Sequence, residues 1–210
     1  MYASVADLRG EGVTSTEASD ERLVVLIEEA TQFIDRLTGW CFEPRTMSLR
    51  LNGRGSGVLE LPVPPIRITR LVINEIELPT SPEDEVVFWA PIPSYFDGPR
   101  LVLLRGVFPR GHANVLVEGR FGYTEYDGTP EGRTPLAIRR ACMLLVLRSL
   151  APLTSETSSE ARSRWRVTEE RTRDQSFKLA SIEGGAAFTG DPEIDALLGP
   201  YARHSALGAA

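Results

Sequence analysis

Long hydrophobic runs are absent from the sequence. The longest unbroken apolar stretch, Ala141–Leu147, is seven residues long, whereas a helix needs about 20 apolar residues to cross a bilayer. A membrane span is therefore not expected. The N-terminal stretch MYASVADLRGEG contains neither a basic segment nor an apolar one, so we also expect no signal peptide and a protein that is made in the cytoplasm.

Cysteine and histidine, two common metal ligands, are scarce. The two cysteines, Cys41 and Cys142, lie in or just after helical apolar patterns. This placement predicts small buried thiols in a reducing compartment, with a disulfide as the alternative. The two histidines, His112 and His204, have no cysteine or second histidine at ligand spacing, so a zinc site is not expected.

Catalytic signatures are absent as well. The sequence has no G-x-S-x-G turn, no Walker loop and no dinucleotide fingerprint. Adjacent acids such as Glu28-Glu29 and Glu169-Glu170 occur in solvated contexts, and neighbouring residues on a helix point about 100° apart. We therefore predict a protein that is not an enzyme and has no catalytic, cofactor-binding or metal-binding residues.

The charge balance is acidic, with 29 acidic and 23 basic residues and a net charge of -6. A general nucleic-acid binder needs a basic face to neutralise phosphates, so that class is not expected. With 210 residues, of which 42% are hydrophobic, the chain can bury a substantial core as one or two domains.

The segment Thr134–Leu150, TPLAIRRACMLLVLRSL, reads as a helix that is apolar on nearly every side. Thr134 is suited to the N-cap and Pro135 to the first helical position. Within the helix only Arg139, Arg140, Arg148 and Ser149 are polar. Such a helix is surrounded by other elements, so we expect it to be the central helix of the fold.

An amphipathic helix is predicted from Ser19 or Asp20 to about Leu37, and it is the natural partner of the central helix. Gly39 follows as the left-handed residue that ends it. One apolar stripe recurs at steps of three and four residues; it comprises Leu23, Leu26, Ile27, Ala30, Phe33, Ile34 and Leu37.

A period of two, typical of half-buried strands, begins at Thr46. The glycine-rich loop Gly53–Gly57 is predicted to close a hairpin between strands at 46–52 and 58–63; a phosphate-binding loop would instead need a helix after it. A bulge is expected near Arg70. About six strands are expected, the others at 66–73, 86–89, 100–104 and 114–123.

Two C-terminal segments follow. Thr154–Lys178 is rich in polar and charged residues and is either a solvated linker or an arm that orders against a neighbouring subunit. Asp191-Pro192-Glu193 opens a short helix, which would dock on a partner or, alternatively, on its own domain. The candidate partner-interface residues are Trp165, Val167 and Phe177 in the arm and Ile194, Leu197, Leu198 and Tyr201 in the helix.

These patterns together predict an α+β fold. Residues 1–45 and 130–153 would form a small helical bundle, and residues 46–124 an inserted antiparallel β-sandwich or small barrel. Residues 154–210 would form an extended C-terminal arm with a short docking helix.

Several helical segments, in this order, resemble the head-to-tail connector proteins of tailed bacteriophages, also called adaptor or head-completion proteins. The resemblance is carried by the Ala-Asp-Leu-Arg turn, the stretch LIEEATQFIDRLTGWCFEPRT, the arginine-bearing helix Ile138–Leu150, the polar arm and the terminal TGDPEIDALLGPYAR. The β region Thr46–Tyr123 departs from the small helical members of this family, because it is much larger.

The resemblance implies a structural protein of the virion neck. Such a protein forms a homo-oligomeric ring, usually twelvefold, beneath the portal protein, extends the DNA channel and offers a surface to the next neck or tail-completion protein. DNA would pass through the channel without specific binding, and no cofactor or membrane is implied. The alternative is a β-sandwich ligand- or carbohydrate-binding accessory module of a virion, with Trp89, Tyr95, Phe96 and Tyr123 as an exposed aromatic platform.

Overall fold

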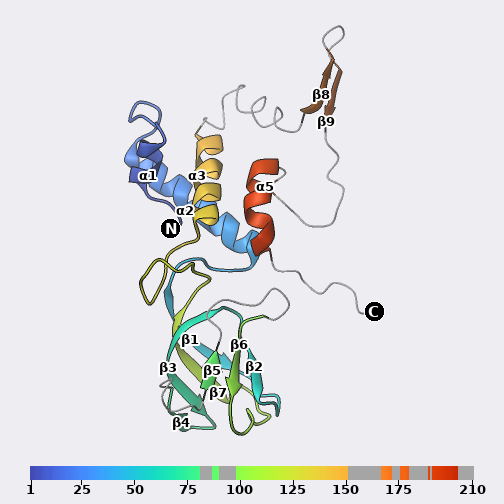
Figure 1. Cartoon of the computed structure of the whole chain (residues 1–210). Helices are drawn as coiled ribbons and strands as arrows, with labels where there is room; N and C mark the ends of the chain where they lie inside the picture. Colours follow the sequence, from blue (N-terminus) through green and yellow to red (C-terminus); the bar gives the residue numbers. More distant parts are fainter. Residues whose placement is uncertain are drawn as a thin grey trace. The chain divides into compact units, whose positions relative to one another are not determined.

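The computed structural model describes residues 1–80, 87–89, 98–150, 167–171, 176–179, 189 and 191–202. The chain divides into two compact units (Figure 1). The helical unit consists of Met1–Gly39 together with Leu136–Ala210, and the β unit is Trp40–Pro135. The α+β class and the insertion of the β region between two packed helices agree with the prediction.

In the helical unit, a long helix packs against a second helix that follows the inserted β unit in the sequence. Its elements are α1 (Val5–Gly10), α2 (Asp20–Thr38), α3 (Leu136–Ser149), α5 (Pro192–Leu198) and the short 3-10 helix η2 (Gly199–Tyr201). Helix α2 packs against α3, and α3 packs against α5. None of the described helices is long and apolar enough to span a membrane.

The two ends of α2 lie where the sequence predicts them. The side chain of Ser19 accepts a hydrogen bond from the backbone N–H of Arg22, which satisfies one of the free amides at the start of the helix. Gly39 ends the helix with φ of 74°, a left-handed conformation that glycine adopts without a Cβ clash.

The buried face of α2 differs in part from the predicted stripe. Phe33 is exposed, whereas Thr31 and Thr38 are buried. The Thr31 hydroxyl accepts a hydrogen bond of 3.2 Å from the backbone N–H of Tyr2, and the Thr38 hydroxyl donates one of 2.8 Å to the carbonyl of Ile34. Because these bonds satisfy the hydroxyls, threonine can occupy buried positions of the helix, which a search for apolar residues alone does not identify.

Helix α3 is less completely buried than its composition predicts. One face supplies core residues, among them Ile138, Ala141, Cys142 and Val146. Leu136 is exposed, and Leu145 and Leu147 are only half-buried. The expectation of a helix buried on nearly every side is therefore corrected, because α2 and α5 cover only part of its circumference.

The β unit is a sandwich of two sheets, and the described strands do not close into a barrel. Its strands are β1 (Arg45–Leu51), β2 (Val58–Glu60), β3 (Pro65–Ile73), β4 (Ile76–Leu78), β5 (Val87–Trp89), β6 (Arg100–Leu103) and β7 (Val115–Phe121). One sheet has the order β1-β7-β3-β4 and the other the order β2-β6-β5. Every pairing is antiparallel.

The predicted hairpin between the first two strands is wrong. Strand β1 pairs with β7, and β2 pairs with β6 in the other sheet. The glycine-rich loop carries the chain from one sheet to the other: the N–H of Gly55 donates to the carbonyl of Phe108 at 2.8 Å. A Cβ at Gly53 would lie 2.0 Å from the carbonyl oxygen of Pro109, so this crossing requires glycine.

The bulge predicted near Arg70 is present. The β3–β7 register shifts between Ile68 and Arg70, and also between Pro65 and Arg67. Gly119 of β7 lies opposite this irregular stretch, and a Cβ there would lie 2.1 Å from the carbonyl oxygen of Arg67. The close backbone approach at the bulge therefore depends on a glycine in the facing strand.

Strand β4 was not predicted from the sequence. It forms a hairpin with β3 through Asn74 and Glu75, which both have positive φ, at 48° and 69°. Asparagine tolerates this conformation, but glutamate is uncommon in it. The Asn-Glu pair is therefore not a residue pair from which a two-residue hairpin turn is predicted.

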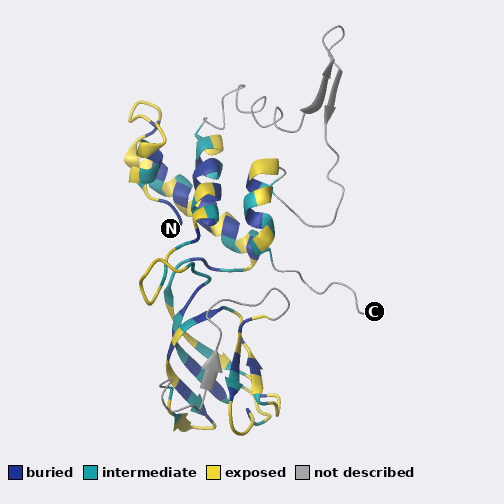
Figure 2. Ribbon diagram, viewed as in Figure 1, coloured by how far each residue is buried: buried dark blue, intermediate teal, exposed yellow. Residues whose placement is uncertain are grey.

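The core of the sandwich lies between its two sheets (Figure 2). Side chains of both sheets are almost fully buried there. They include Leu59, Leu101 and Leu103 from one sheet and Ile68, Leu71, Val115, Val117 and Phe121 from the other.

In the C-terminal segment, β8 (Val167–Arg171) and β9 (Ser176–Leu179) form an antiparallel pair with an irregular register near Val167. No regular structure was predicted here, because apolar residues are few.

Candidate assembly surfaces

The three arginines of α3 hold neighbouring elements of the helical unit. Arg139 forms an ion pair with Asp7 of α1, in which its Nε lies 3.1 Å from a carboxylate oxygen. Arg140 lies 3.3 Å from the carboxylate of Glu11, the residue that follows α1. These pairs explain two polar positions in an apolar helix: they attach the N-terminal segment to α3.

Arg148 makes the corresponding contacts to α5. It forms an ion pair with Asp191 and lies 3.4 Å from Glu193. Asp191 is also the N-cap of α5, and its side chain accepts hydrogen bonds from the backbone N–H groups of Glu193 and Ile194. The buried carboxylate therefore orders the start of α5 and links it to α3.

The carboxyl group of Asp7 has a lowered pKa. Burial acts to raise its pKa, but hydrogen bonds from Arg139 and from Ser4 outweigh this effect. Asp7 also belongs to a capping box, in which the Ser4 backbone N–H donates to its carboxylate at 2.8 Å. This carboxylate thus stays ionised and holds the N-terminal helix in place.

The candidate residues of the C-terminal helix separate into two groups. Ile194 and Leu198 are almost fully buried within the helical unit, where α5 packs on α3. Leu197 and Tyr201 are half-buried. Docking of α5 on its own domain, the alternative considered above, therefore accounts for Ile194 and Leu198.

The arm residues are less fully described. Trp165 lies outside the described residues. Val167 and Phe177 lie in β8 and β9, at the strand positions given above. Their assignment to a partner interface stays a prediction.

A groove of about 460 Å³ lies between α1 and α3. The half-exposed side chain of Leu136 contributes to its lining, and the two ion pairs of α1 with α3 border it. Its lining consists of Ala6, Asp7, Gly10, Glu11, Leu136, Arg139 and Met143.

Both cysteines are buried free thiols, as predicted from the sequence. Burial raises the pKa of Cys142 to about 11, because its thiolate would be poorly solvated. The described residues contain no group of three or more potential ligands that could hold a metal ion.

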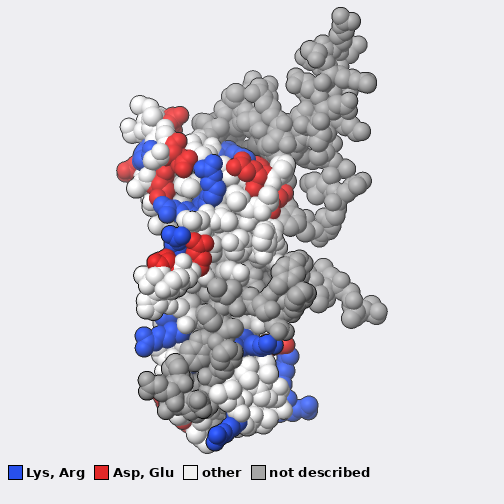
Figure 3. Space-filling model, in the orientation of Figure 1, with Lys and Arg blue, Asp and Glu red and all other residues white. Residues whose placement is uncertain are grey.

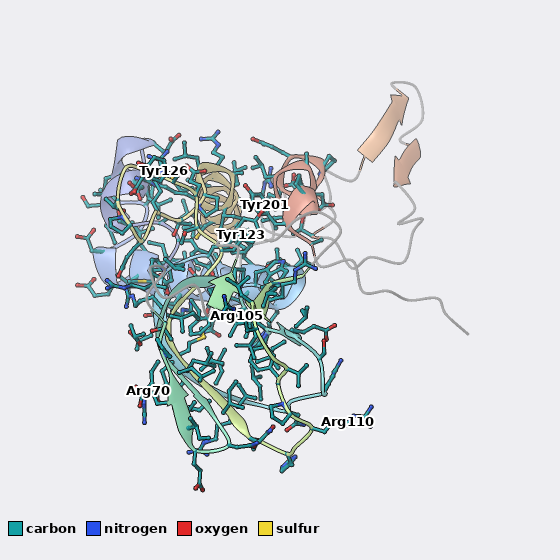
Figure 4. All side chains as sticks on the ribbon, turned by 60° about the horizontal axis from the view of Figure 1, so that its bottom comes forward. Arg70, Arg105, Arg110, Tyr123, Tyr126 and Tyr201 are labelled. Carbon is teal, nitrogen blue, oxygen red and sulfur yellow. The ribbon has the colours of Figure 1, made fainter. Side chains whose placement is uncertain are left out.

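Tyr126 is the most exposed large hydrophobic residue of the described chain, at 82%. It lies in a loop of the β unit that is closed by reciprocal backbone hydrogen bonds between Glu125 and Arg133, at 2.9 and 3.0 Å. The same two residues form a side-chain ion pair at 2.7 Å. An ordered loop thus presents an aromatic side chain to solvent; the residue is labelled in Figure 4. This loop was not predicted from the sequence, although the Asp127-Gly128 turn directly after Tyr126 was the available signal.

The aromatic platform of the alternative interpretation is not assembled at Tyr123. This ring packs against Phe42 and Trp40, with centroid separations of 5.7 and 6.2 Å. Tyr95 and Phe96 lie outside the described residues, and Trp89 lies in β5. Tyr123 therefore contributes to packing inside the β unit.

An exposed apolar strip lies on the outer face of the β2–β6 pair. We define it by Val58, Val102, Leu104 and Val107; three of these are large exposed hydrophobics, Val58 at 40% and Leu104 and Val107 at 53% each. Val58 lies directly opposite Val102 in the register. Arg54, Arg105 and Arg110, in the loops before β2 and after β6, are exposed. Figure 3 shows an uncharged area on the β unit with Lys and Arg atoms along part of its margin.

A second hollow, of about 600 Å³, lies on the other sheet and includes Arg50, Arg70 and His112 in its lining. Arg70 is paired there with Glu77 at 3.1 Å and with Glu118 at 3.4 Å. Figure 4 shows Arg70 and Arg110 on opposite sides of the β unit.

No protein-family model matches the chain, and no curated protein sequence matches it. Solved structures do match. One is a chain in the neck of an empty gene transfer agent particle computed with C6 symmetry, with 18% identity and a TM-score of 0.52; the match covers 98% of this chain and 91% of that chain. Another is a chain in the neck of the native particle computed with C12 symmetry, with 17% identity, the same coverage and a TM-score of 0.52. The chain shares the fold of these neck proteins.

Proposed function

We propose that this chain is a structural, non-enzymatic protein of the neck of a phage-like particle. It forms a ring, twelvefold in the simplest case, beneath the portal protein, extends the DNA channel and joins the head to the tail. The observation that carries the proposal is the structural match to neck chains over 98% of the chain. Because this match includes both units and the C-terminal segment, it concerns the whole architecture and not a widespread small domain.

The order of the helical segments supports the same role independently. The resemblance to head-to-tail connectors rests on the N-terminal turn, α2, α3 and the terminal helix, and these four elements form the helical unit of the structure. The β unit, inserted between α2 and α3, is an addition to that arrangement. A neck protein can use such an added unit to contact a neighbour, because each unit has its own core.

The charge distribution suits a conduit for DNA. The net charge is -6, and the arginines of α3 are all engaged by carboxylates of their own unit. A basic lumen would retain DNA by releasing counterions from its phosphates. An acidic chain with internally paired arginines instead lets DNA slide past.

The proposed partner-facing residues of this ring lie in the C-terminal helix and in the arm. Leu197 of α5 and Tyr201 of η2 are half-buried, and we propose that their exposed parts contact a portal protein or a neighbouring copy. Trp165, Val167 and Phe177 of the arm are proposed for the same interface, and the next neck or tail-completion protein would bind the far side of the ring.

The experiment is to delete the gene for this chain in a particle-producing strain and to image the particles by cryo-electron microscopy. We expect DNA-filled heads that lack tails or have lost DNA, and full particles when the wild-type chain is supplied in trans. In the complemented particles, averaging of the neck should place a ring of this chain between portal and tail. Normal tailed particles without the chain would contradict the proposal.

A further inference from the structure

The outer face of a sandwich sheet normally carries polar side chains, because its inner face already supplies the core. The apolar strip departs from this pattern. The inward side chains Leu59, Leu101 and Leu103 are buried, as expected. Of their outward neighbours, Glu60 and Arg100 are charged, yet Val58 and Leu104 are aliphatic. Contiguous exposed apolar side chains bordered by polar ones mark interaction surfaces.

Two adjacent loops place positive charge around the strip. The backbone of Ser56 accepts from the N–H of Phe108 at 2.8 Å, so the loop before β2 and the loop after β6 run side by side. They carry three exposed arginines, Arg54, Arg105 and Arg110. Arg110 lies against the first loop, where its Nε donates to the carbonyl of Arg54 at 3.3 Å, and Arg105 lies elsewhere on the second loop, well separated from Arg110 in Figure 4. Within the part of the chain that the structure describes, only Arg54 of these forms an ion pair, with Glu60 at 3.2 Å. The strip and these arginines form the basic apolar surface.

Helix α2 carries a surface with the opposite charge. Val25 is 52% exposed and has Glu21, Glu28 and Glu29 as its neighbours at helical spacing. Phe33, a further large exposed hydrophobic residue, lies one turn beyond Glu29. These five residues, on the side of α2 away from the core, form the acidic apolar surface; the exposed Arg22 and Arg36 lie at its two ends, one turn before Val25 and one turn after Phe33.

We infer that the basic apolar surface of one copy binds the acidic apolar surface of α2 on a neighbouring copy. This inference rests on the proposed ring function, because a closed ring uses two different surfaces of each subunit. Both surfaces combine aliphatic or aromatic side chains with charges of one dominant sign, and the signs are complementary. Apolar contact supplies the affinity, and the Arg–Glu pairs supply the orientation and exclude self-pairing of like surfaces.

Charge reversal provides the test. One variant carries Arg54→Glu and Arg105→Glu, and the other carries Glu28→Arg and Glu29→Arg; all four side chains are exposed. The full-length proteins are examined by sedimentation velocity over a range of concentrations at low and moderate salt. We expect the wild-type chain to associate, and each variant alone to associate at least tenfold more weakly.

A mixture of the two variants is the decisive sample. One variant then has two acidic surfaces and the other has two basic ones, so the two can alternate around an even-numbered ring. We expect the mixture to regain association close to that of the wild type. The matched control carries Arg50→Glu and Arg67→Glu, which reverse the same number of positive charges at exposed positions of the other sheet. This control should associate as the wild type does.

The inference is overturned if the wild-type chain stays monomeric at every concentration, if either variant associates normally, or if the mixture fails to recover. Unchanged urea unfolding of each variant verifies that folding is intact. The proposed function is tested separately. If the Arg54→Glu, Arg105→Glu chain is still found in the neck of complemented particles, the proposed ring is supported and the proposed pair of surfaces is wrong.

Discussion

Arg148 of α3 is ion-paired with Asp191, the residue that caps the N-terminus of α5. The pair joins two helices that are separated by the whole C-terminal arm, so it fixes the end of the chain to its core. The side chain of Asp191 is almost fully buried, whereas that of Arg148 is partly exposed. Loss of the arginine would therefore leave a buried carboxylate without its counter-charge.

Replacing Arg148 with Met should destabilise the helical unit by about 1–3 kcal/mol, because breaking a buried pair leaves a costly unpaired charge. Urea unfolding at neutral pH measures the change. The matched control is Arg140→Met, whose pair with Glu11 is exposed on both sides; its cost should be under about 1 kcal/mol. Equal effects of the two substitutions would show that Asp191 does not depend on Arg148.

Ile194→Ala and Leu197→Ala should separate the structural role of α5 from its assembly role. Ile194 is almost fully buried against the unit, so its truncation should cost about 2–4 kcal/mol. Leu197 is half-buried, and its truncation should change the stability by less than about 1 kcal/mol. If Leu197 serves the partner interface, the Leu197→Ala chain should fold normally but complement the deletion strain poorly. A large loss of stability for Leu197→Ala would instead assign it to the core.

Val146→Asp in α3 should prevent folding, whereas Leu136→Asp should be tolerated. Val146 is fully buried, and an unpaired carboxylate there costs several kcal/mol. Leu136 lies at the exposed start of the helix, where an acidic residue also interacts favourably with the helix dipole. Circular dichroism and the melting temperature of the two variants provide the measurement. A soluble, cooperatively folded Val146→Asp chain would contradict the packing of α3.

The buried thiol of Cys142 should make stability fall at high pH. Its pKa is raised to about 11 in the folded chain from 9.0. Between these two pKa values the folded state keeps the thiol proton while the unfolded state loses it. The thiol's contribution to the free energy of unfolding is therefore full below the unfolded pKa and is lost as the pH rises through about 11. The loss should be on the order of 2 kcal/mol. Unfolding curves of the wild type and of Cys142→Ala between pH 8 and 11 test this; the variant should show a shallower fall.

Thiol labelling gives a second reading of the same site. With both cysteines buried, a thiol reagent should react slowly with the native chain and at once after unfolding. Rapid labelling of the native protein would indicate that Cys142 is accessible.

Local features of the sequence determined both ends of α2 and the start of α5, whereas α1 was expected only as a turn. Ser19 and Gly39 fix the ends of α2 through a side-chain cap and a left-handed residue, both of which act within one turn. The start of α5 at Asp191-Pro192 is equally local. The strands of alternating pattern and the bulge near Arg70 were also predicted, because the period of two and its interruption are visible in the residues themselves.

Pairing in the sheets was decided only by the tertiary structure. Strands β1 and β2 are neighbours in sequence, yet each pairs with a strand forty or more residues further along the chain. Their alternating patterns fit several partners equally well, and the choice depends on which side chains close the common core. The same limit explains β4, whose turn at Asn74-Glu75 is held by its surroundings.

The sequence by itself determined the fold class and the absence of catalytic motifs, because composition, periodicity and caps are properties of short segments. Only the tertiary structure decided which groups the arginines of α3 contact and where α5 packs. Arg139, Arg140 and Arg148 could have faced DNA, a partner or solvent, and the carboxylates that engage them come from elements far away in the chain. The exposed strip around Val58 and Leu104 likewise emerges only when two loops, distant in sequence, are brought side by side by backbone hydrogen bonds.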